Sequence, residues 1–341
     1  MPCKFALVLA LTVWAGLGGG LAADAAKPPA RPAVVMLPSL SQEAAEKIVE
    51  AARKKAEQVE SGVFKGQKCR MHVYVLGREG TLLASTQANG AWQGSADIAM
   101  RKARTAWFFK LPTRLIGELS RTDKEAKAPL YGIEISNGGL ITFPGGLPIF
   151  DATGALSGSI GVSGDSVDCD EAVAQAGVEK ANELGKLAVL QLPSLSQAGA
   201  AEVLHAAIKK AGETESGVYK AKTKMHIYVL GREGTILAAG QADDAWPGSA
   251  DIAHRKARTV WLFRFPTGVI GDLSRLDKEA KAPLYAIEGS NGGLISFPGG
   301  LPIVDENGEF LGAIGVSGDT VAKDHEVAQA GVDAFKARLK K

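Results

Sequence analysis

The sequence predicts an α+β fold made of two tandem copies of one domain, each an antiparallel five-stranded sheet with helices packed on it. The first observation is a long internal repeat, since SNGGLITFPGGLPI from Ser136 recurs as SNGGLISFPGGLPI from Ser290, and 290 − 136 = 154 positions. The second is the element order within each copy: helix, two strands, two helices, three strands, helix. Strands joined by hairpin-length connections favour antiparallel pairing, with the helices set to cover the sheet. One domain has therefore been duplicated.

The first half of each copy predicts a helix followed by a hairpin. Ser39 and Gln42 fit a capping box, and apolar residues then recur every three or four positions to about Glu60. Residues 71–76 alternate in polarity, and the GREG turn at 77–80 leads into a second strand. This pattern predicts a β-hairpin.

The second half predicts helices and then short strands. Residues 94–109 have helical periodicity, Pro112 stops that helix, and Thr113 caps a short helix through Leu119. Three strands are expected around 131–135, 140–149 and 155–162, separated by glycine turns. A last helix begins after Asp165 or Ser166.

The domain boundaries follow from the ends of the repeat. A lysine precedes an apolar run from Phe5 to Leu17, which is shorter than the ~20 apolar residues that a spanning helix needs. We therefore predict a signal peptide at 1–25 and a protein exported to the periplasm or beyond. A tether at 26–36 leads to copy 1 at 37–185 and copy 2 at 186–341. The short link between the copies predicts an internal pseudo-dimer.

The charge composition argues against nucleic acid as a partner. The 39 basic and 37 acidic side chains are spread along the chain, so there is no basic stripe for nucleic acid and we expect none as a partner. After removal of the leader, Cys69 and Cys169 remain, and their counterparts are Thr223 and Lys323. A disulfide and two unpaired thiols are both open, and the spacing shows no zinc motif.

Standard catalytic motifs are missing from the sequence. It contains neither GxGxxG after a strand nor GxxxxGK[ST], and GVSGD lacks the spacing of a nucleophile elbow. The glycine-rich phrase has two interpretations: its residues suit tight turns, and its free amides could bind an anionic group. The candidate ligand residues in this phrase are Asn137, Gly138, Gly139, Phe143, Gly145 and Gly146, with Asn291, Gly292, Gly293, Phe297, Gly299 and Gly300 in copy 2.

The combined motifs carry a family resemblance. SNGGL-x-FPGGLPI, GVSGD and VAQAG, preceded by GSADIA-x-RKART, resemble the haem-degrading or haem-binding HbpS/GlcG-like domain family over nearly all of each copy. The resemblance implies a profilin-like α+β fold that assembles into dimers and larger rings. It also implies binding of haem or a related small ligand, and it implies catalysis only weakly. No catalytic residues are carried over.

Side chains that suit haem occur at equivalent places in the two copies. Haem iron is held by His, Cys, Met or Tyr. His72 and His226 are paired in this way, and each has a tyrosine two residues later, Tyr74 and Tyr228, on the same strand face. That face would line a pocket shared across the pseudo-dimer or form a polar outer surface. Arg104 and Arg258 are candidates for the haem propionates or for a solvated helix face.

These inferences favour an exported tandem-domain protein that binds haem or a similar tetrapyrrole. It would form an intramolecular pseudo-dimer, with assembly into a higher homo-oligomer also open, and it would have no membrane span once the leader is removed. Two alternatives stay open. One is an enzyme that breaks haem down oxidatively, and the other is a sensing or structural accessory module that holds an organic acid.

Overall fold

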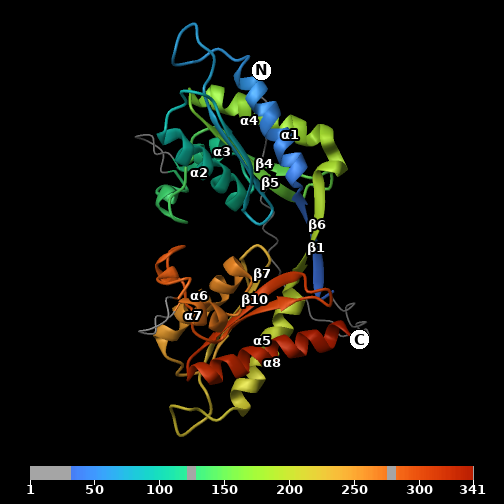
Figure 1. The fold of residues 1–341 in the computed structure, drawn as a ribbon, viewed down its shortest axis with the longest axis vertical. Coiled ribbons are helices and arrows are strands. Elements are labelled where there is room, and N and C mark those ends of the chain that lie inside the picture. Colours follow the sequence, from blue (N-terminus) through green and yellow to red (C-terminus); the bar gives the residue numbers. More distant parts are fainter. Residues whose placement is uncertain (1–31, 121–127, 275–281, 341) are drawn as a thin grey trace, which may run out of the picture. The chain divides into compact units, whose positions relative to one another are not determined.

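The computed structural model describes residues 32–120, 128–274 and 282–340 (Figure 1). From Pro32 onward the chain forms one compact unit. The expected signal peptide and most of the expected tether lie outside the described residues. Within the described ranges, no helix is both long enough and apolar enough to cross a membrane.

Apart from the 3-10 helix η2 that links them, the two copies repeat the same order of elements, in which η marks a 3-10 helix. Copy 1 contains β1 (Val34–Leu40), α1 (Gln42–Ala56), β2 (His72–Gly77), β3 (Leu82–Gln87), α2 (Gly94–Phe109), α3 (Thr113–Ser120), η1 (Ile133–Ile135), β4 (Gly146–Phe150), β5 (Leu156–Ser163) and α4 (Val167–Leu184). Copy 2 contains η2 (Gly185–Ala188), β6 (Val189–Leu195), α5 (Gln197–Glu213), β7 (His226–Gly231), β8 (Ile236–Gln241), α6 (Pro247–Phe263), α7 (Thr267–Ser274), η3 (Ile287–Gly289), β9 (Gly300–Val304), β10 (Phe310–Ser317) and α8 (Val321–Leu339). The α+β class and the tandem arrangement are confirmed.

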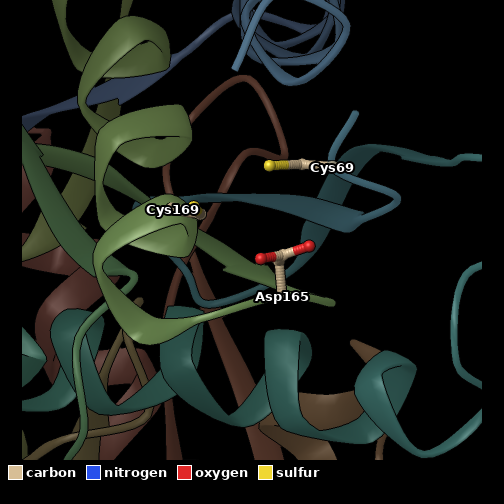
Figure 2. Close-up of side chains that lie close together, drawn as sticks. All are labelled: Cys69, Asp165 and Cys169. Carbon is tan, nitrogen blue, oxygen red and sulfur yellow. The ribbon is translucent and has the colours of Figure 1, made fainter. Parts of the chain in front are cut away.

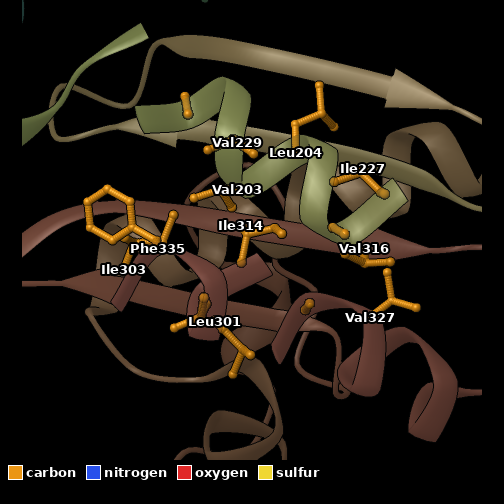
Figure 3. Close-up of a cluster of buried hydrophobic side chains, with 14 of the residues drawn as sticks. Val203, Leu204, Ile227, Val229, Leu301, Ile303, Ile314, Val316, Val327 and Phe335 are labelled. Carbon is orange, nitrogen blue, oxygen red and sulfur yellow. The ribbon is translucent and has the colours of Figure 1, made fainter. Parts of the chain in front are cut away.

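Each copy is built in three layers around an antiparallel sheet. The strand order is β3-β2-β5-β4 in copy 1 and β8-β7-β10-β9 in copy 2. In copy 1, α1 and α4 cover one face and α2 covers the other (Figure 1). Alternation along β2 sends Val73 and Val75 into the core beneath α1 and α4, where Ile48 and Ile160 are fully buried. Figure 3 shows the equivalent core of copy 2, around Val229 and Ile314. Burying each such side chain stabilises the fold by about 1.5–3 kcal/mol.

The first strand of each copy pairs with the first strand of the other. β1 and β6 run antiparallel, and Leu37 lies opposite Leu192, which is its own counterpart because 37 + 155 = 192. The pair is thus symmetric about that position, as in a two-fold dimer. The two hairpin turns also exchange ion pairs, from Arg78 to Glu233 at 2.5 Å and from Arg232 to Glu79 at 2.8 Å. The predicted pseudo-dimer is confirmed.

The strand predictions need correction. Each sheet has four strands rather than five. The strand expected at 131–135 is a 3-10 turn, where Gly132 has φ of 80° and so breaks an extended run. The strand expected at 140–149 is confined to β4. The leading strands β1 and β6 were missed, and residues 34–36 belong to β1 rather than to the tether.

The helix predictions hold with smaller corrections. α2 begins and ends at the predicted residues, and α4 is capped by Ser166. α1 ends at Ala56 rather than near Glu60, and its cap is Ser41, because Ser39 lies inside β1. The hydroxyl of Thr113 does not cap α3, since it donates to the carbonyl oxygen of Phe143 at 2.9 Å.

Candidate functional site

A fully buried ion pair supports the glycine-rich phrase in each copy. Lys102 of α2 places its Nζ 2.6 Å from Asp170 Oδ2 of α4 and 2.9 Å from the carbonyl oxygen of Val162 in β5. The ammonium also lies 4.7 Å from the centre of the Phe143 ring. Lys256, Asp324 and Phe297 repeat this arrangement in copy 2. Sequence analysis missed both pairs, although they occupy equivalent positions in the repeat.

Burial perturbs both members of the pair. Removal from water lowers the pKa of Lys102 and raises the pKa of Asp170, and the attraction between the two charges opposes both shifts. The same directions hold for Lys256 and Asp324. A buried pair of this kind locks three elements together, because each partner depends on the other for its solvation.

Gly145 lies directly against this pair. Its φ is 113°, and an added Cβ would lie 2.7 Å from the carbonyl oxygen of Val162 and 2.8 Å from Lys102 Nζ. Glycine is therefore required both by the backbone angle and by the close approach. The next residue, Gly146, donates its amide to Thr113 Oγ1 at 3.0 Å. These contacts assign the second glycine pair a structural role in positioning β4.

The first glycine pair forms a turn that uses its own polar groups. Asn137, Gly138 and Gly139 all have positive φ, and the amide of Gly139 donates to the carbonyl oxygen of Ser136 at 2.9 Å. Arg101 donates to the carbonyl oxygen of Gly138 at 3.0 Å. In copy 2, Asn291, Gly292 and Gly293 adopt the same turn, and Arg255 takes the place of Arg101. The predicted binding of an anion here stays a prediction.

The His-x-Tyr pairs lie under helices, contrary to both expected placements. His72 and His226 are 2% and 5% exposed. His226 Nδ1 is 2.9 Å from Ser249 Oγ of α6, so this strand face packs against the helix and forms neither a shared pocket nor an outer surface. His72 Nε2 has no hydrogen-bond partner among the described residues.

The other predicted side chains are dispersed. Tyr74 and Tyr228 are half-buried on the same covered face, and the Tyr228 ring lies 5.4 Å from that of His254. Arg104 is exposed, with its guanidinium 5.7 Å from the Phe108 ring, whereas Arg258 is half-buried. The structure therefore does not bring the predicted histidines and arginines together.

Two tyrosines that sequence analysis placed in strands are exposed instead. Tyr131 and Tyr285 precede η1 and η3 and are 75% and 64% exposed. Apolar side chains are also exposed at two further pairs of equivalent positions, Leu111 with Phe265 and Leu115 with Val269. The sequence could have drawn attention to these two tyrosines, because each ends a copy of the repeated phrase DKEAKAPLY.

Two cysteines and an aspartate form a cluster in copy 1, and copy 2 lacks both cysteines. Cys69, Asp165 and Cys169 place their ligand atoms within 4.8 Å of one another (Figure 2). Burial raises the pKa of Cys69 to about 12, and the neighbouring charge of Asp165 adds to this effect. Burial would also raise the pKa of Asp165, but hydrogen bonds from Ser61 and from backbone amides outweigh it and hold that pKa below its usual value. Both cysteines are free thiols in the structure.

Comparison with known proteins places both copies in one family. The family model described as "Haem degrading protein HbpS-like" matches residues 40–179 and 195–333. A Citrobacter freundii protein, the uncharacterized 15.0 kDa protein of the dhaT-dhaS intergenic region, is 34% identical over 141 residues, which are 41% of this chain and 96% of that protein.

Three solved structures are similar over about one copy. The Klebsiella pneumoniae protein ORFY is 25% identical over 46% of this chain and 97% of its own, with a TM-score of 0.37. The complex of PduOC with heme is 27% identical over 42% and 94%, with a TM-score of 0.36. HbpS is 33% identical over 41% and 89%, with a TM-score of 0.34. With the family model matched twice along its length, the chain belongs to the HbpS-like family and carries two copies of that family's domain.

Proposed function

We propose that this chain is an exported protein that binds haem or a related tetrapyrrole, with one binding face on each copy. One observation carries the proposal. A family model described as haem-degrading and HbpS-like matches each of the two copies. Export rests on the leader-like N-terminal sequence. The proposal therefore assigns the duplication a purpose, namely two binding sites in one chain.

The donors available to haem iron differ from those expected. His72 and His226 do not fit, because they are buried beneath α2 and α6 and the helix would have to move before iron could reach either ring. Tyr131 and Tyr285 do fit, since a tyrosine phenol is among the side chains that hold haem iron and both rings are exposed. We therefore transfer the proposed iron contact from the histidines to these tyrosines.

The surroundings of the tyrosines suit a flat, largely apolar ligand. Leu130, next to Tyr131, donates its amide to the carbonyl oxygen of Leu119 at 2.9 Å, and Leu284 donates to Leu273 in the same way, so each tyrosine lies beside the end of α3 or α7. Apolar side chains are exposed on those short helices at Leu115 and Val269, and just beyond the ends of α2 and α6 at Leu111 and Phe265. A porphyrin would cover such side chains and remove them from water. Arg104 and Arg258 remain the candidates for the propionates. Bound haem iron would supply any redox chemistry, and the chain's own groups would bind and orient it.

Hemin titration followed by Soret absorption tests this proposal. Wild-type protein should give a saturable shift, and Tyr131→Phe/Tyr285→Phe should abolish the shift at the same concentrations. Tyr74→Phe/Tyr228→Phe is the matched control, because it makes the same chemical change on the covered strand face and should leave the spectrum unchanged. A missing saturable shift in wild type would reject haem binding. A shift lost in His72→Gln/His226→Gln but kept without the exposed phenols would reject the tyrosine assignment.

Haem breakdown is a second candidate, favoured by the description of the matched family. Loss of the bound haem spectrum on addition of peroxide or a reductant, with release of a linear tetrapyrrole, would distinguish breakdown from binding. Free hemin also bleaches, so an unrelated haem-binding protein is the required control. Mass spectrometry of molecules retained through purification would reveal an organic acid if the glycine turn holds one instead.

A further inference from the structure

We propose that Cys69, Asp165 and Cys169 form a binding site for a thiophilic divalent cation such as Zn²⁺, present in copy 1 and absent from the equivalent place in copy 2. The proposal is independent of haem binding.

The three donors converge from separate segments. Cys69 lies just before β2, Asp165 lies between β5 and α4, and Cys169 lies in the first turn of α4. Figure 2 shows the Asp165 carboxylate directed toward the space beside the Cys69 sulfur. Zn–S and Zn–O bonds of about 2.3 and 2.0–2.2 Å place the ligand atoms of a tetrahedral site roughly 3–4 Å apart. The observed spread of up to 4.8 Å therefore needs only a small contraction.

The carboxylate is already oriented. Asp165 Oδ1 accepts hydrogen bonds from the amides of Gly62 and Ser166 at 2.7 and 2.8 Å, and Oδ2 accepts one from Ser61 Oγ at 2.5 Å. An ionised carboxylate offers about four lone-pair directions, so these three bonds leave capacity for a cation. Hydrogen bonds of this kind to a ligand oxygen are the usual support of a metal site.

Copy 2 builds the same carboxylate without the thiols. Asp319 accepts hydrogen bonds from Ser216 Oγ and from the amides of Gly217 and Thr320, so the oriented carboxylate is a feature of the fold itself. Thr223 Oγ1 donates to the carbonyl oxygen of Ala211 at 2.8 Å, and Lys323 pairs with Glu326 at 2.9 Å. Copy 1 replaces both of these satisfied side chains with thiols that meet at Asp165. The concerted difference points to a joint role for the two cysteines.

A cation accounts for this cluster better than a disulfide does. Thiol–disulfide exchange requires an accessible thiolate, whereas Cys69 is 4% exposed and therefore offers little access to an oxidant or to a partner thiol from solution. On binding Zn²⁺, the two thiols release two protons to solvent, and two thiolates and one carboxylate then surround the metal. The carboxylate that lies beside the two sulfurs thus becomes the third ligand.

Cobalt and zinc titrations of the reduced full chain test the inference. We expect one Co²⁺ per chain with a thiolate-to-metal charge-transfer band, displaced by one equivalent of Zn²⁺. Cys69→Thr/Cys169→Lys installs the residues of copy 2 and should abolish the band. Thr223→Cys/Lys323→Cys makes the reverse change and should raise the stoichiometry to two. Far-ultraviolet circular dichroism of each variant shows whether it has kept the fold.

Three results would overturn the inference. One is a missing charge-transfer band in reduced wild-type protein. Another is a band and stoichiometry that persist in a folded Cys69→Thr/Cys169→Lys variant. The third is a Cys69–Cys169 disulfide in protein purified without reductant, seen as a mass lower by two hydrogen atoms. Since none of these measurements uses hemin, the metal inference can fail while the proposed haem binding stands.

Discussion

The two copies share a buried ion pair, a glycine turn and a strand order, and differ at other positions that include part of the core. The Lys–Asp pair, the glycine turn and the strand order are the same in both, down to hydrogen bonds of nearly equal length. The differences are spread over each copy, and two of them concern groups that can bind or titrate: Cys69 and Cys169 correspond to Thr223 and Lys323, and Met100 corresponds to His254. Burial alone has not kept positions alike, since the buried Ser157 and Ala181 correspond to the buried Leu311 and Phe335. The positions that have stayed alike are those of the ion pair and of the glycines whose backbone angles require glycine.

Removal of one charge from the buried ion pair should cause the largest loss of stability, and the loss should be similar in the two copies. Lys102→Met leaves Asp170 buried without its partner, and we expect a loss of about 3–5 kcal/mol in the free energy of unfolding. Lys256→Met should cost a similar amount in copy 2. Denaturant unfolding measures both losses, and hydrogen exchange assigns each to its own copy.

An apolar replacement of the whole pair is the control. Lys102→Met/Asp170→Leu removes both charges and should recover much of the lost stability, because an apolar pair of similar volume needs no solvation. A loss below about 1 kcal/mol for Lys102→Met alone would contradict the role assigned to the pair.

The two glycine pairs should respond unequally to alanine. Gly145→Ala combines an unfavourable φ with a Cβ pressed against backbone and Lys102, so we expect a loss above the ~1–3 kcal/mol typical of backbone strain alone. Gly138→Ala has the same kind of φ but meets no atom within 4 Å, so about 1 kcal/mol is expected. Thermal unfolding of the two variants compares them. Equal losses would show that the close approach at Gly145 contributes nothing.

Of the two glutamates that form ion pairs between the hairpin turns, Glu79 should contribute more stability than Glu233. Glu79 accepts from both Arg232 and Arg264, at 2.8 and 2.9 Å, whereas the pairs that the structure describes for Glu233 involve Arg78 alone. Glu79→Gln should therefore cost about 1.5–3 kcal/mol and Glu233→Gln less. Double-mutant cycles with the facing arginines measure each coupling. A larger loss for Glu233→Gln would reverse the expected order.

The smallest expected effect is a pH dependence found in copy 2. Burial lowers the pKa of His254, so the folded state favours the neutral ring. The nearby charges are Asp251, which opposes this shift, and Arg255 and Arg258, which add to it. Stability from this group is full above the unfolded pKa of about 6.5 and is lost as the pH falls from that value through the lower pKa of the folded state.

Replacement by the residue of copy 1 isolates this group. His254→Met should lose less stability than wild type when the pH is lowered from 7 to 5, as measured by thermal unfolding at each pH. Met100→His is the reverse variant and should introduce the same dependence into copy 1. Parallel curves for wild type and His254→Met would contradict the assignment.

Local sequence patterns correctly predicted the helices and turns that are determined by neighbouring residues. The limits of α2 followed from its periodicity, and the turn at 77–80 followed from its glycines. β1 and β6 were missed because each contains a proline and finds its partner in the other copy, so no local hairpin signal exists. The strand expected at 131–135 failed because Gly132 takes a positive φ that the apolar residues around it do not reveal.

The candidate site residues were harder to predict, because their burial and contacts depend on how helices pack on the sheet and on residues far apart in the sequence. Alternation correctly placed His72 and Tyr74 on one strand face, but only the packing of α2 shows that this face is covered. The Cys69–Cys169 cluster joins residues 100 positions apart, since 169 − 69 = 100, and no short motif marks it. Lys102 appears in the sequence as one charge of an exposed-looking RKART phrase, whereas the fold buries it completely.

The central claim is that both copies bind haem through equivalent faces, and counting haem per chain tests it most directly. Wild-type protein titrated with hemin should saturate at two equivalents, Tyr131→Phe should saturate at one, and Tyr131→Phe/Tyr285→Phe should bind none at the same concentrations. Saturation of wild type at one equivalent or fewer, or stoichiometry unchanged in all three proteins, would contradict the claim.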